Sequence, residues 1–321
     1  MMTSWIELTK EVQSVKPEDI PEGGSQYDVV RKKYYKELVA LTKRPLVVYA
    51  TAFHFQPKAV LFGNLMSIDL SDKDGFEEVI DKLKGDKLDI LIHSPGGSAE
   101  AAESIVKIIR KKFPKDVRFI ITGTAKSAAT MLAMSGNSIL ISAAGELGPI
   151  DPQVRIDNRF SPAGSIIDQF DKAVKDIRTN PTHFNAWLPM LKQYGPSLLV
   201  ECENFIKLAR DLVKNWLAEY MFSGEPQPKR RAGRISKFLA NEKNTLSHAR
   251  RIDYAKLKEL GLRISLLEDE PQNIQDALRT VHLIIMQTLE GTNAIKIHEN
   301  SQGDAFIRSA QPIALTPNAA Q

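Results

Sequence analysis

The chain of 321 residues has little cysteine and no long apolar run, and each shortage excludes a class of protein. Its one cysteine, Cys202, excludes an intramolecular disulfide and a zinc site built from several cysteines, and it fits a reducing compartment. A bilayer span takes about 20 consecutive apolar residues, and the chain has no such stretch. The first residues also lack the apolar core of a signal peptide. The sequence therefore predicts a cytoplasmic protein without a membrane anchor.

The net charge is also small, and the sequence contains no metal-binding motif. The formal net charge of +4 is small for this length and does not indicate a nucleic-acid partner. The six histidines are scattered, and no His-Glu-x-x-His motif, phosphate-binding loop or dinucleotide fingerprint occurs. Residues 226–234 are basic without interleaved aromatic residues, which favours a solvated loop before a helix over a nucleic-acid patch. We expect neither a metal nor a cofactor.

What the chain does have is a regular alternation of apolar strands and amphipathic helices over residues 88–144. The runs LDILIHS, VRFIITG and SILISAA predict three strands, and helices are expected between them, the first with Ser98 as its N-cap. A further strand is predicted within residues 62–70. Strands and helices that alternate through short connections are typical of parallel strands with right-handed crossovers. The prediction is an α/β fold with a parallel sheet.

The flanking segments differ from this pattern. Residues 1–27 are polar and predict a loosely ordered lead-in, and an amphipathic helix follows and ends near residue 44. Helical periodicity dominates residues 160–245 and returns before residue 290. Residues 291–321 have no period, so we expect a flexible tail. We interpret the chain as one domain over residues 45–290, preceded by the lead-in and helix of residues 1–44.

Two strand-to-helix turns carry the residues on which chemistry could be built. The turn HSPGGS places Gly96 and Gly97 where bare backbone N–H groups can approach a ligand. The turn GTAKSAAT places Ser127 at a helix start, where the helix dipole favours developing negative charge. Because the carboxyl ends of parallel strands meet at one edge, we expect both turns there. A serine beside a donor-rich turn supplies two of the three parts of an acyl-transfer site.

Each of these candidates has a purely structural alternative. The glycine pair alone is typical of a tight turn, and Ser127 also suits the ordinary role of an N-cap. Lys126 is disfavoured as a base for its neighbour, because adjacent residues at a helix start point about 100° apart. His54 and His93 lie near the ends of predicted strands, where a buried structural histidine is the commoner occurrence.

The tracts HSPGGSAEAAESIV and TGTAKSAATMLAMSGNSILISAAGELGPIDPQ resemble the serine dehydrogenase proteinase family of the Clp protease/crotonase superfamily, which is related to signal-peptide peptidase A. The match is dense over about residues 88–155, and LGPIDPQ is its most specific part. It weakens toward YGPSLLVECENFIKLARDLVKNWLAEYM and resumes at SHARRIDYAKLKELGLRIS. The resemblance implies a Clp/crotonase-like superhelical core of repeated β-α units over residues 88–155, a helical region over 160–245 and a closing motif over 246–268.

The resemblance also implies an ATP-independent serine peptidase with a Ser–Asp–His triad. Carried over residue by residue, it assigns Ser127 as the nucleophile, Asp151 as the acid and His248 as the base. The oxyanion donors are then the N–H groups of Gly97 and Ala128, with Gly96 in support. Flanking prolines would hold the backbone of Asp151 stiffly, which suits an orienting acid.

The acid and the base keep alternatives. Asp151 could instead close its turn through an Asx-type hydrogen bond, and His248 could be a surface residue beside two arginines. The family's histidine motif commonly reads THxHPI, whereas this chain has SHARRI, so a lysine stays a second candidate for the base.

The resemblance implies a peptide or protein substrate and, because Clp/crotonase folds form rings or trimers, a homo-oligomer. Two other functions stay open. One is a crotonase-like acyl-CoA-binding enzyme that uses the oxyanion turn without a nucleophile. The other is a catalytically inactive oligomeric scaffold that presents its helical segments to a partner. The serine at the helix start favours the peptidase, since a crotonase needs none there.

Overall fold

The computed structural model describes residues 3–156 and 159–310, and a seven-stranded sheet with the order β11-β10-β1-β2-β3-β5-β9 lies at its centre. Its strands are β1 (Leu46–Thr51), β2 (Lys87–His93), β3 (Asp116–Ile121), β5 (Ser138–Ile141), β9 (Ile264–Leu266), β10 (Ala294–Asn300) and β11 (Ala305–Ser309). The strands from β1 to β9 run parallel to their neighbours, whereas β10 and β11 are antiparallel additions. The predicted α/β class with a mostly parallel sheet is confirmed.

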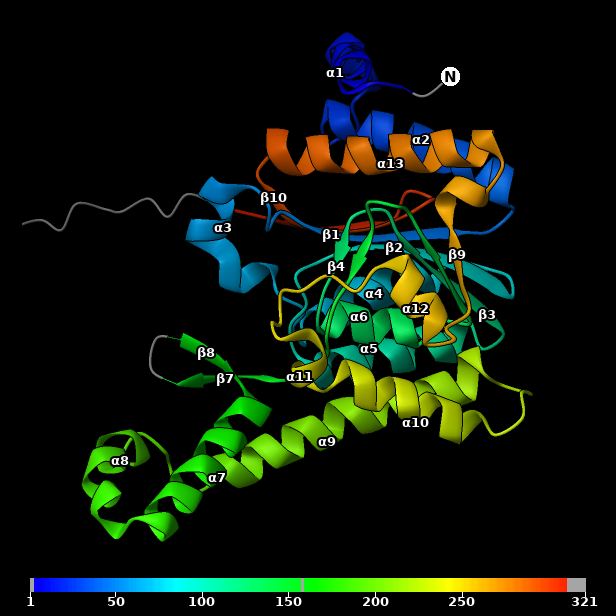
Figure 1. Ribbon diagram of the computed structural model, residues 1–321. Helices are drawn as coiled ribbons and strands as arrows, with labels where there is room; N and C mark the ends of the chain where they lie inside the picture. Colours follow the sequence, from blue (N-terminus) through cyan, green and yellow to red (C-terminus); the bar gives the residue numbers. More distant parts are fainter. Residues whose placement is uncertain (1–2, 157–158, 311–321) are drawn as a thin grey trace, which may run out of the picture.

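Helices cover both faces of this sheet (Figure 1). One face packs against α2 (Gln26–Thr42) and α13 (Gln272–Gly291), and the other against α4 (Asp72–Asp81), α5 (Ala99–Lys112) and α6 (Ala128–Met134). The strands are apolar without alternation because both of their faces are buried. In β1, Val47 and Tyr49 join the core under α4 and α5, and Val48 joins the core under α2.

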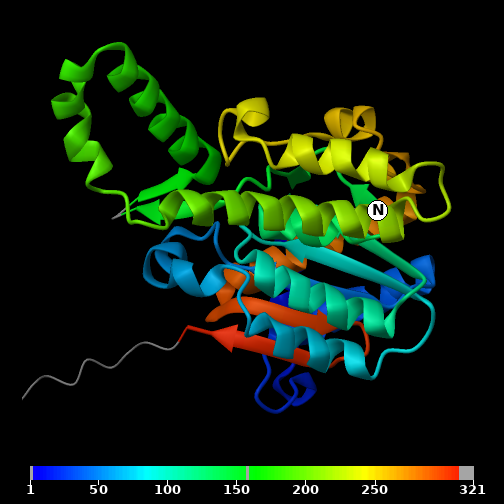
Figure 2. The same cartoon turned by 90° about the horizontal axis from the view of Figure 1, so that it is seen from below.

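The helical region that follows the sheet strands extends beyond the sheet. It contains α7 (Ala163–Thr179), α8 (Phe184–Leu191), α9 (Leu198–Trp216), α10 (Pro228–Leu239), α11 (Glu242–Thr245) and α12 (Tyr254–Glu259). In Figure 1, α9 runs below the sheet, and Figure 2 shows α7 and α8 projecting away from the main body. The hairpin of β7 (Gln153–Ile156) and β8 (Arg159–Pro162) connects this arm to the sheet, and the inner parts of α9 and α10 pack into the main core.

Three short segments differ from the sequence predictions. Residues 5–14 are not loose but form α1 (Trp5–Ser14), which Ser4 and Glu7 close with a reciprocal capping box and which buries Leu8 and Val12. The strand predicted within residues 62–70 is instead the end of α3 (Gln56–Phe62) and a 3₁₀ helix (Gly63–Met66). Most of the basic tract of residues 226–234 is likewise not loop, because α10 begins at Pro228.

The largest correction concerns the expected flexible tail. Residues 294–300 form β10, in which every residue is buried, and β11 pairs beside it. The apolar pattern of a buried strand is absent from this sequence because β10 buries charged side chains. Lys296 pairs with Asp72 on one face, and Glu299 pairs with Arg31 on the other. The rest of the expected tail, residues 311–321, lies outside the described residues.

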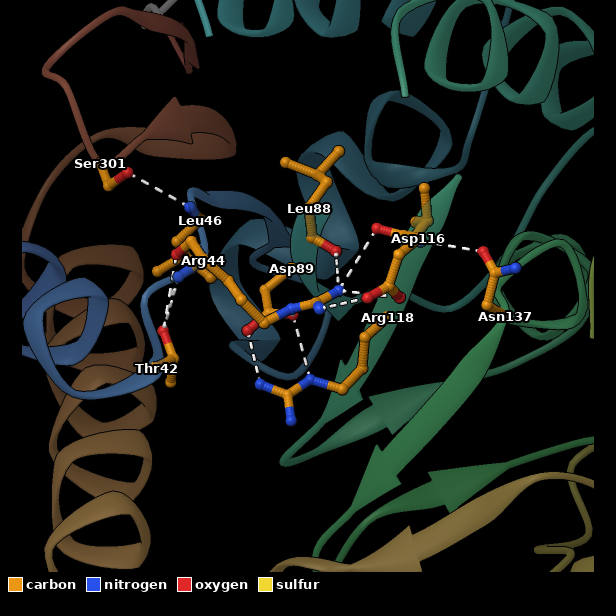
Figure 3. A network of polar contacts seen from close by, with 10 residues as sticks. Thr42, Arg44, Leu46, Leu88, Asp89, Asp116, Arg118, Asn137 and Ser301 are labelled. Atoms are coloured by element: carbon orange, nitrogen blue, oxygen red, sulfur yellow. Dashed lines mark hydrogen bonds and ion pairs between the residues drawn. The ribbon is translucent and has the colours of Figure 1, made fainter. Parts of the chain in front are cut away.

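A cluster of ion pairs fastens the amino-terminal edge of the sheet (Figure 3). The Arg44 guanidinium, just before β1, donates to Asp89 of β2 and to Asp116 of β3, the latter at 2.6 Å. Arg118 of β3 also donates to Asp89, at 2.6 Å. These contacts hold the starts of three strands in register at the edge opposite the candidate site.

Candidate active site

The two glycine- and serine-bearing turns meet at the carboxyl edge of the sheet, as expected. After β2, the N–H of Ser94 donates to the carbonyl of Thr124 at 2.8 Å, and the N–H of Lys126 donates to the carbonyl of Ser94 at 3.1 Å. The second turn is further fixed by β4 (Thr124–Ala125), which pairs with β6 (Glu146–Leu147). Hydrogen bonds between backbone groups therefore fix the distance between the two turns.

Gly96 allows the closest approach between the turns. Its φ of +100° favours glycine, and a Cβ there would lie 2.6 Å from the Cβ of Ser127. The N–H of Gly96, however, donates to the Ser94 hydroxyl at 3.1 Å. The supporting role of Gly96 stays a prediction; the structure has its N–H bonded to Ser94, and the lack of a Cβ leaves room for Ser127.

The N–H of Gly97 points away from residues 67–69, the segment that pairs with this turn. Within it, the N–H of Ile68 donates to the Gly96 carbonyl at 2.7 Å, and the Ile68 carbonyl accepts from Ser98 at 2.9 Å. In this parallel bridge the N–H and carbonyl of Gly97 itself point to the opposite side. A Cβ on Gly97 would overlap the Ile68 backbone. Ser98 then caps α5 through the Ala101 N–H at 3.1 Å, as predicted.

Ser127 occupies a strained position at the start of α6. Its φ of 50° with ψ of −120° is rare for a side-chain-bearing residue, and such strain concentrates at functional turns. Its hydroxyl makes no capping hydrogen bond, so the N-cap alternative does not describe it. Within the described part of the chain, the N–H groups of Gly97 and Ala128 have no acceptor. An uncapped hydroxyl and two unused donors therefore lie on adjoining turns.

Asp151 and His248 form a hydrogen-bonded pair, with His248 Nδ1 2.8 Å from Asp151 Oδ1. The Asp151 side chain is 2% exposed and that of His248 is 26% exposed, so the ring reaches solvent while the carboxylate does not. Leu147 brings the two segments together, because its carbonyl accepts from the Ile252 N–H at 3.0 Å.

Gln153 is a site residue that was missed by the sequence reasoning. Its Nε2 donates to Asp151 Oδ2 at 2.7 Å, so the two carboxylate oxygens are held by Gln153 and His248 rather than by an Asx turn. The only available signal was its place at the end of the LGPIDPQ tract.

A cavity of about 660 Å³ joins these groups. Ser127, His248, Gly97 and Gln153 line it. The remaining wall is mainly apolar and includes Met131, Ile150, Phe160, Phe205 and Leu208. The two phenylalanines in this wall are exposed to solvent: Phe160 is 69% exposed and Phe205 is 39% exposed. Ser127, the His248 ring and Gly97 of the first turn therefore line one cavity.

The Lys126 ammonium group is occupied by partners other than Ser127. Its Nζ forms an ion pair with Glu146 at 2.8 Å and donates to the Leu147 carbonyl at 3.3 Å. This arrangement agrees with the argument from helix geometry that disfavoured Lys126 as the base.

His93 and His54 belong to a ring cluster beside the turns. The Thr124 N–H donates to His93 Nδ1 at 3.2 Å, and the His93 ring centroid lies 5.0 Å from that of His54 and 6.0 Å from that of His282. Burial keeps the pKa of His93 well below its ordinary value and lowers that of His282 to about 4. The rings of His93 and His282 are therefore neutral and support the turn as structural residues.

Among the residues that the structure describes, no helix has the length and apolarity needed to cross a membrane.

Comparisons with known proteins add relatives without an assigned role. An uncharacterised protein of Methanocaldococcus jannaschii is 27% identical over 242 residues, covering 74% of this chain and 76% of the relative. A second uncharacterised protein of that organism is 24% identical over 178 residues, covering 56% of this chain and 52% of the relative.

Among solved structures, the 1510-N membrane-bound stomatin-specific protease in complex with a substrate peptide is similar at 13% identity, with a TM-score of 0.40. The similarity covers 77% of this chain and 88% of that one. The sequence model of the ClpP-like SDH-type serine proteinases matches residues 26–290, a range that contains both turns and the Asp151–His248 pair. The chain belongs to the family of ClpP-like SDH-type serine proteinases.

Proposed function

We propose that this member of the family hydrolyses peptide bonds without ATP, with Ser127 as nucleophile, His248 as general base and Asp151 as the acid that orients it. The observation that carries the proposal is the hydrogen bond from His248 to the buried Asp151 carboxylate, because the His248 ring lines the same cavity as the strained, uncapped Ser127. A crotonase-like acyl-CoA enzyme would require neither the serine nor this pair.

These proposed roles imply the following reaction. Ser127 Oγ forms a bond to the substrate carbonyl carbon while its proton passes to His248 Nε2, and Asp151 Oδ1 accepts from His248 Nδ1–H. The electron pair of the carbonyl moves to its oxygen, which accepts from the N–H groups of Gly97 and Ala128; each such donor is worth about 3 to 4 kcal/mol. His248 then protonates the amine that leaves as the C–N bond breaks. Water repeats the attack on the acyl-enzyme and restores the Ser127 hydroxyl.

A fluorophosphonate probe tests the nucleophile, because it phosphonylates an activated serine and releases fluoride. The protein should be labelled at Ser127, and Ser127→Ala should abolish labelling. Ser98→Ala is the matched control, since Ser98 lines the same cavity but only caps α5. Labelling that survives Ser127→Ala would refute the assignment.

The identity of the base is tested by a pair of variants. His248→Ala should slow labelling by two or more orders of magnitude on the scale of about 10² to 10⁴ for a general base. Lys126→Met, which removes an ammonium already held by Glu146, should label at close to the wild-type rate. The reverse pattern would assign the base to a lysine.

A further inference from the structure

The oxyanion turn depends on the 67–69 segment for its position. Ile68 bonds the backbone on both sides of Gly97, at 2.7 and 2.9 Å, and Ser67 reaches the cavity wall. If this segment moved, the Gly97 N–H would move with it, because Ile68 makes the hydrogen bonds on both sides of that glycine. The supports of residues 67–69 are therefore supports of the proposed oxyanion hole.

Lys296 of β10 supports the segment. Its side chain is fully buried, and its Nζ donates to the Ser67 carbonyl at 2.7 Å and to Asp69 Oδ2 at 3.0 Å. These acceptors lie on either side of Ile68. A single ammonium group thus fixes both neighbours of the residue that pairs with the oxyanion turn.

The carboxylate of Asp72 also binds the Lys296 ammonium group. Its carboxylate is fully buried and accepts from Lys296 Nζ at 2.8 and 2.9 Å, from the Asp69 N–H at 2.9 Å and from the Tyr49 hydroxyl at 3.1 Å. Burial raises the pKa of Asp72, but the neighbouring His298 and Lys296 outweigh it and leave the pKa below its ordinary value. The carboxylate is therefore ionised, and Lys296 is its buried counter-ion.

We propose that Lys296 is a positioning residue of the oxyanion hole, acting through the 67–69 segment on the Gly97 N–H. The proposal rests on the proposed peptidase function. Lys296 does not act as the general base, because its Nζ is taken by the Ser67 carbonyl and two carboxylates. It also lies beyond residues 26–290, the range matched by the family model, so β10 contributes to the site from outside that range.

The test compares Lys296→Met with Arg31→Met in the full chain. Arg31 is an equally buried cation that pairs with Glu299 on the opposite face of the same strand, so its loss also leaves a buried carboxylate unpaired. The rate of fluorophosphonate labelling reports the oxyanion hole. Hydrogen exchange of the Ser98 amide, which donates to the Ile68 carbonyl, reports the turn without any need for activity.

Lys296→Met should label at least about tenfold more slowly than Arg31→Met, since complete loss of one oxyanion donor costs about 10² to 10³ in rate. The shape of the pH profile of labelling, set by the base, should be unchanged. The Ser98 amide should exchange faster in Lys296→Met only. If Lys296→Met does not fold, Lys296→Met/Asp72→Asn removes both charges and carries the same expectations.

Equal labelling rates in the two variants would overturn the proposal, and so would slow labelling with unchanged Ser98 exchange. If the wild-type protein is not labelled, the peptidase assignment fails by itself. Ser98 exchange then still decides whether Lys296 holds the turn.

Discussion

Mild acid should destabilise this fold through His282. The ring lies on α13 with its Nδ1 3.0 Å from the Thr122 hydroxyl, and burial, followed by the nearby His54, lowers its pKa from 6.5 to about 4. Between these two values the unfolded chain binds a proton that the folded chain does not. The stability that His282 contributes is therefore present above the ordinary histidine pKa and is lost as the pH falls toward the folded value.

The size of the effect follows from these two pKa values. One pKa unit corresponds to about 1.4 kcal/mol, so His282 alone should remove about 2 kcal/mol of unfolding free energy between about pH 7 and about pH 5. His282→Gln is neutral at both pH values and can still hydrogen-bond to Thr122. The variant should therefore lose about 2 kcal/mol less than the wild type over this interval. Urea unfolding at the two pH values measures both losses.

The comparison has an internal control and a clear contrary outcome. At about pH 8 neither protein should respond to a small pH change, because the histidine is neutral in both the folded and the unfolded chain. Some acid loss should remain in the variant, since burial also lowers the pKa of His93. Equal losses in wild type and His282→Gln between about pH 7 and about pH 5 would refute the reasoning.

Three further substitutions test other parts of the structure. Gly97→Ala should slow fluorophosphonate labelling about a hundredfold, because the added Cβ overlaps the Ile68 backbone and displaces the oxyanion donor; a wild-type rate would contradict this. Gln153→Leu should slow labelling about tenfold without changing the urea midpoint, since it frees one Asp151 oxygen; a lower midpoint with an unchanged rate would mean that Gln153 serves only the fold. Arg44→Met should lower the unfolding free energy by about 1 to 3 kcal/mol and leave the labelling rate unchanged, because its ion pairs lie at the opposite edge of the sheet.

The parallel core could be predicted from the sequence because each strand is apolar on both faces and each helix carries an apolar stripe. This was not possible for β10. β10 buries Lys296 and Glu299, whose partners Asp72 and Arg31 lie more than 200 residues away in the sequence. A buried charge resembles a solvated one until the fold brings its counter-ion to it, so local periodicity has nothing to detect.

The candidate site was predictable to a similar extent. The resemblance placed Asp151 and His248 together, and the structure has them 2.8 Å apart. The use of the Gly96 N–H by Ser94 and the role of Gln153 depend on side-chain directions that spacing does not encode. The orientation of the Gly97 N–H likewise depends on a pairing with Ile68 that only the tertiary fold creates.

The antiparallel position of β10 also affects how the protein is made. β1 pairs with β2 on one side and with β10 on the other, and β10 comes from residues 294–300. On the ribosome β1 therefore has an unpaired edge until residues 294–300 have emerged, and such an edge can pair with another chain. Chains stopped at Gly291 should accordingly aggregate during translation, and addition of the final strands should prevent this.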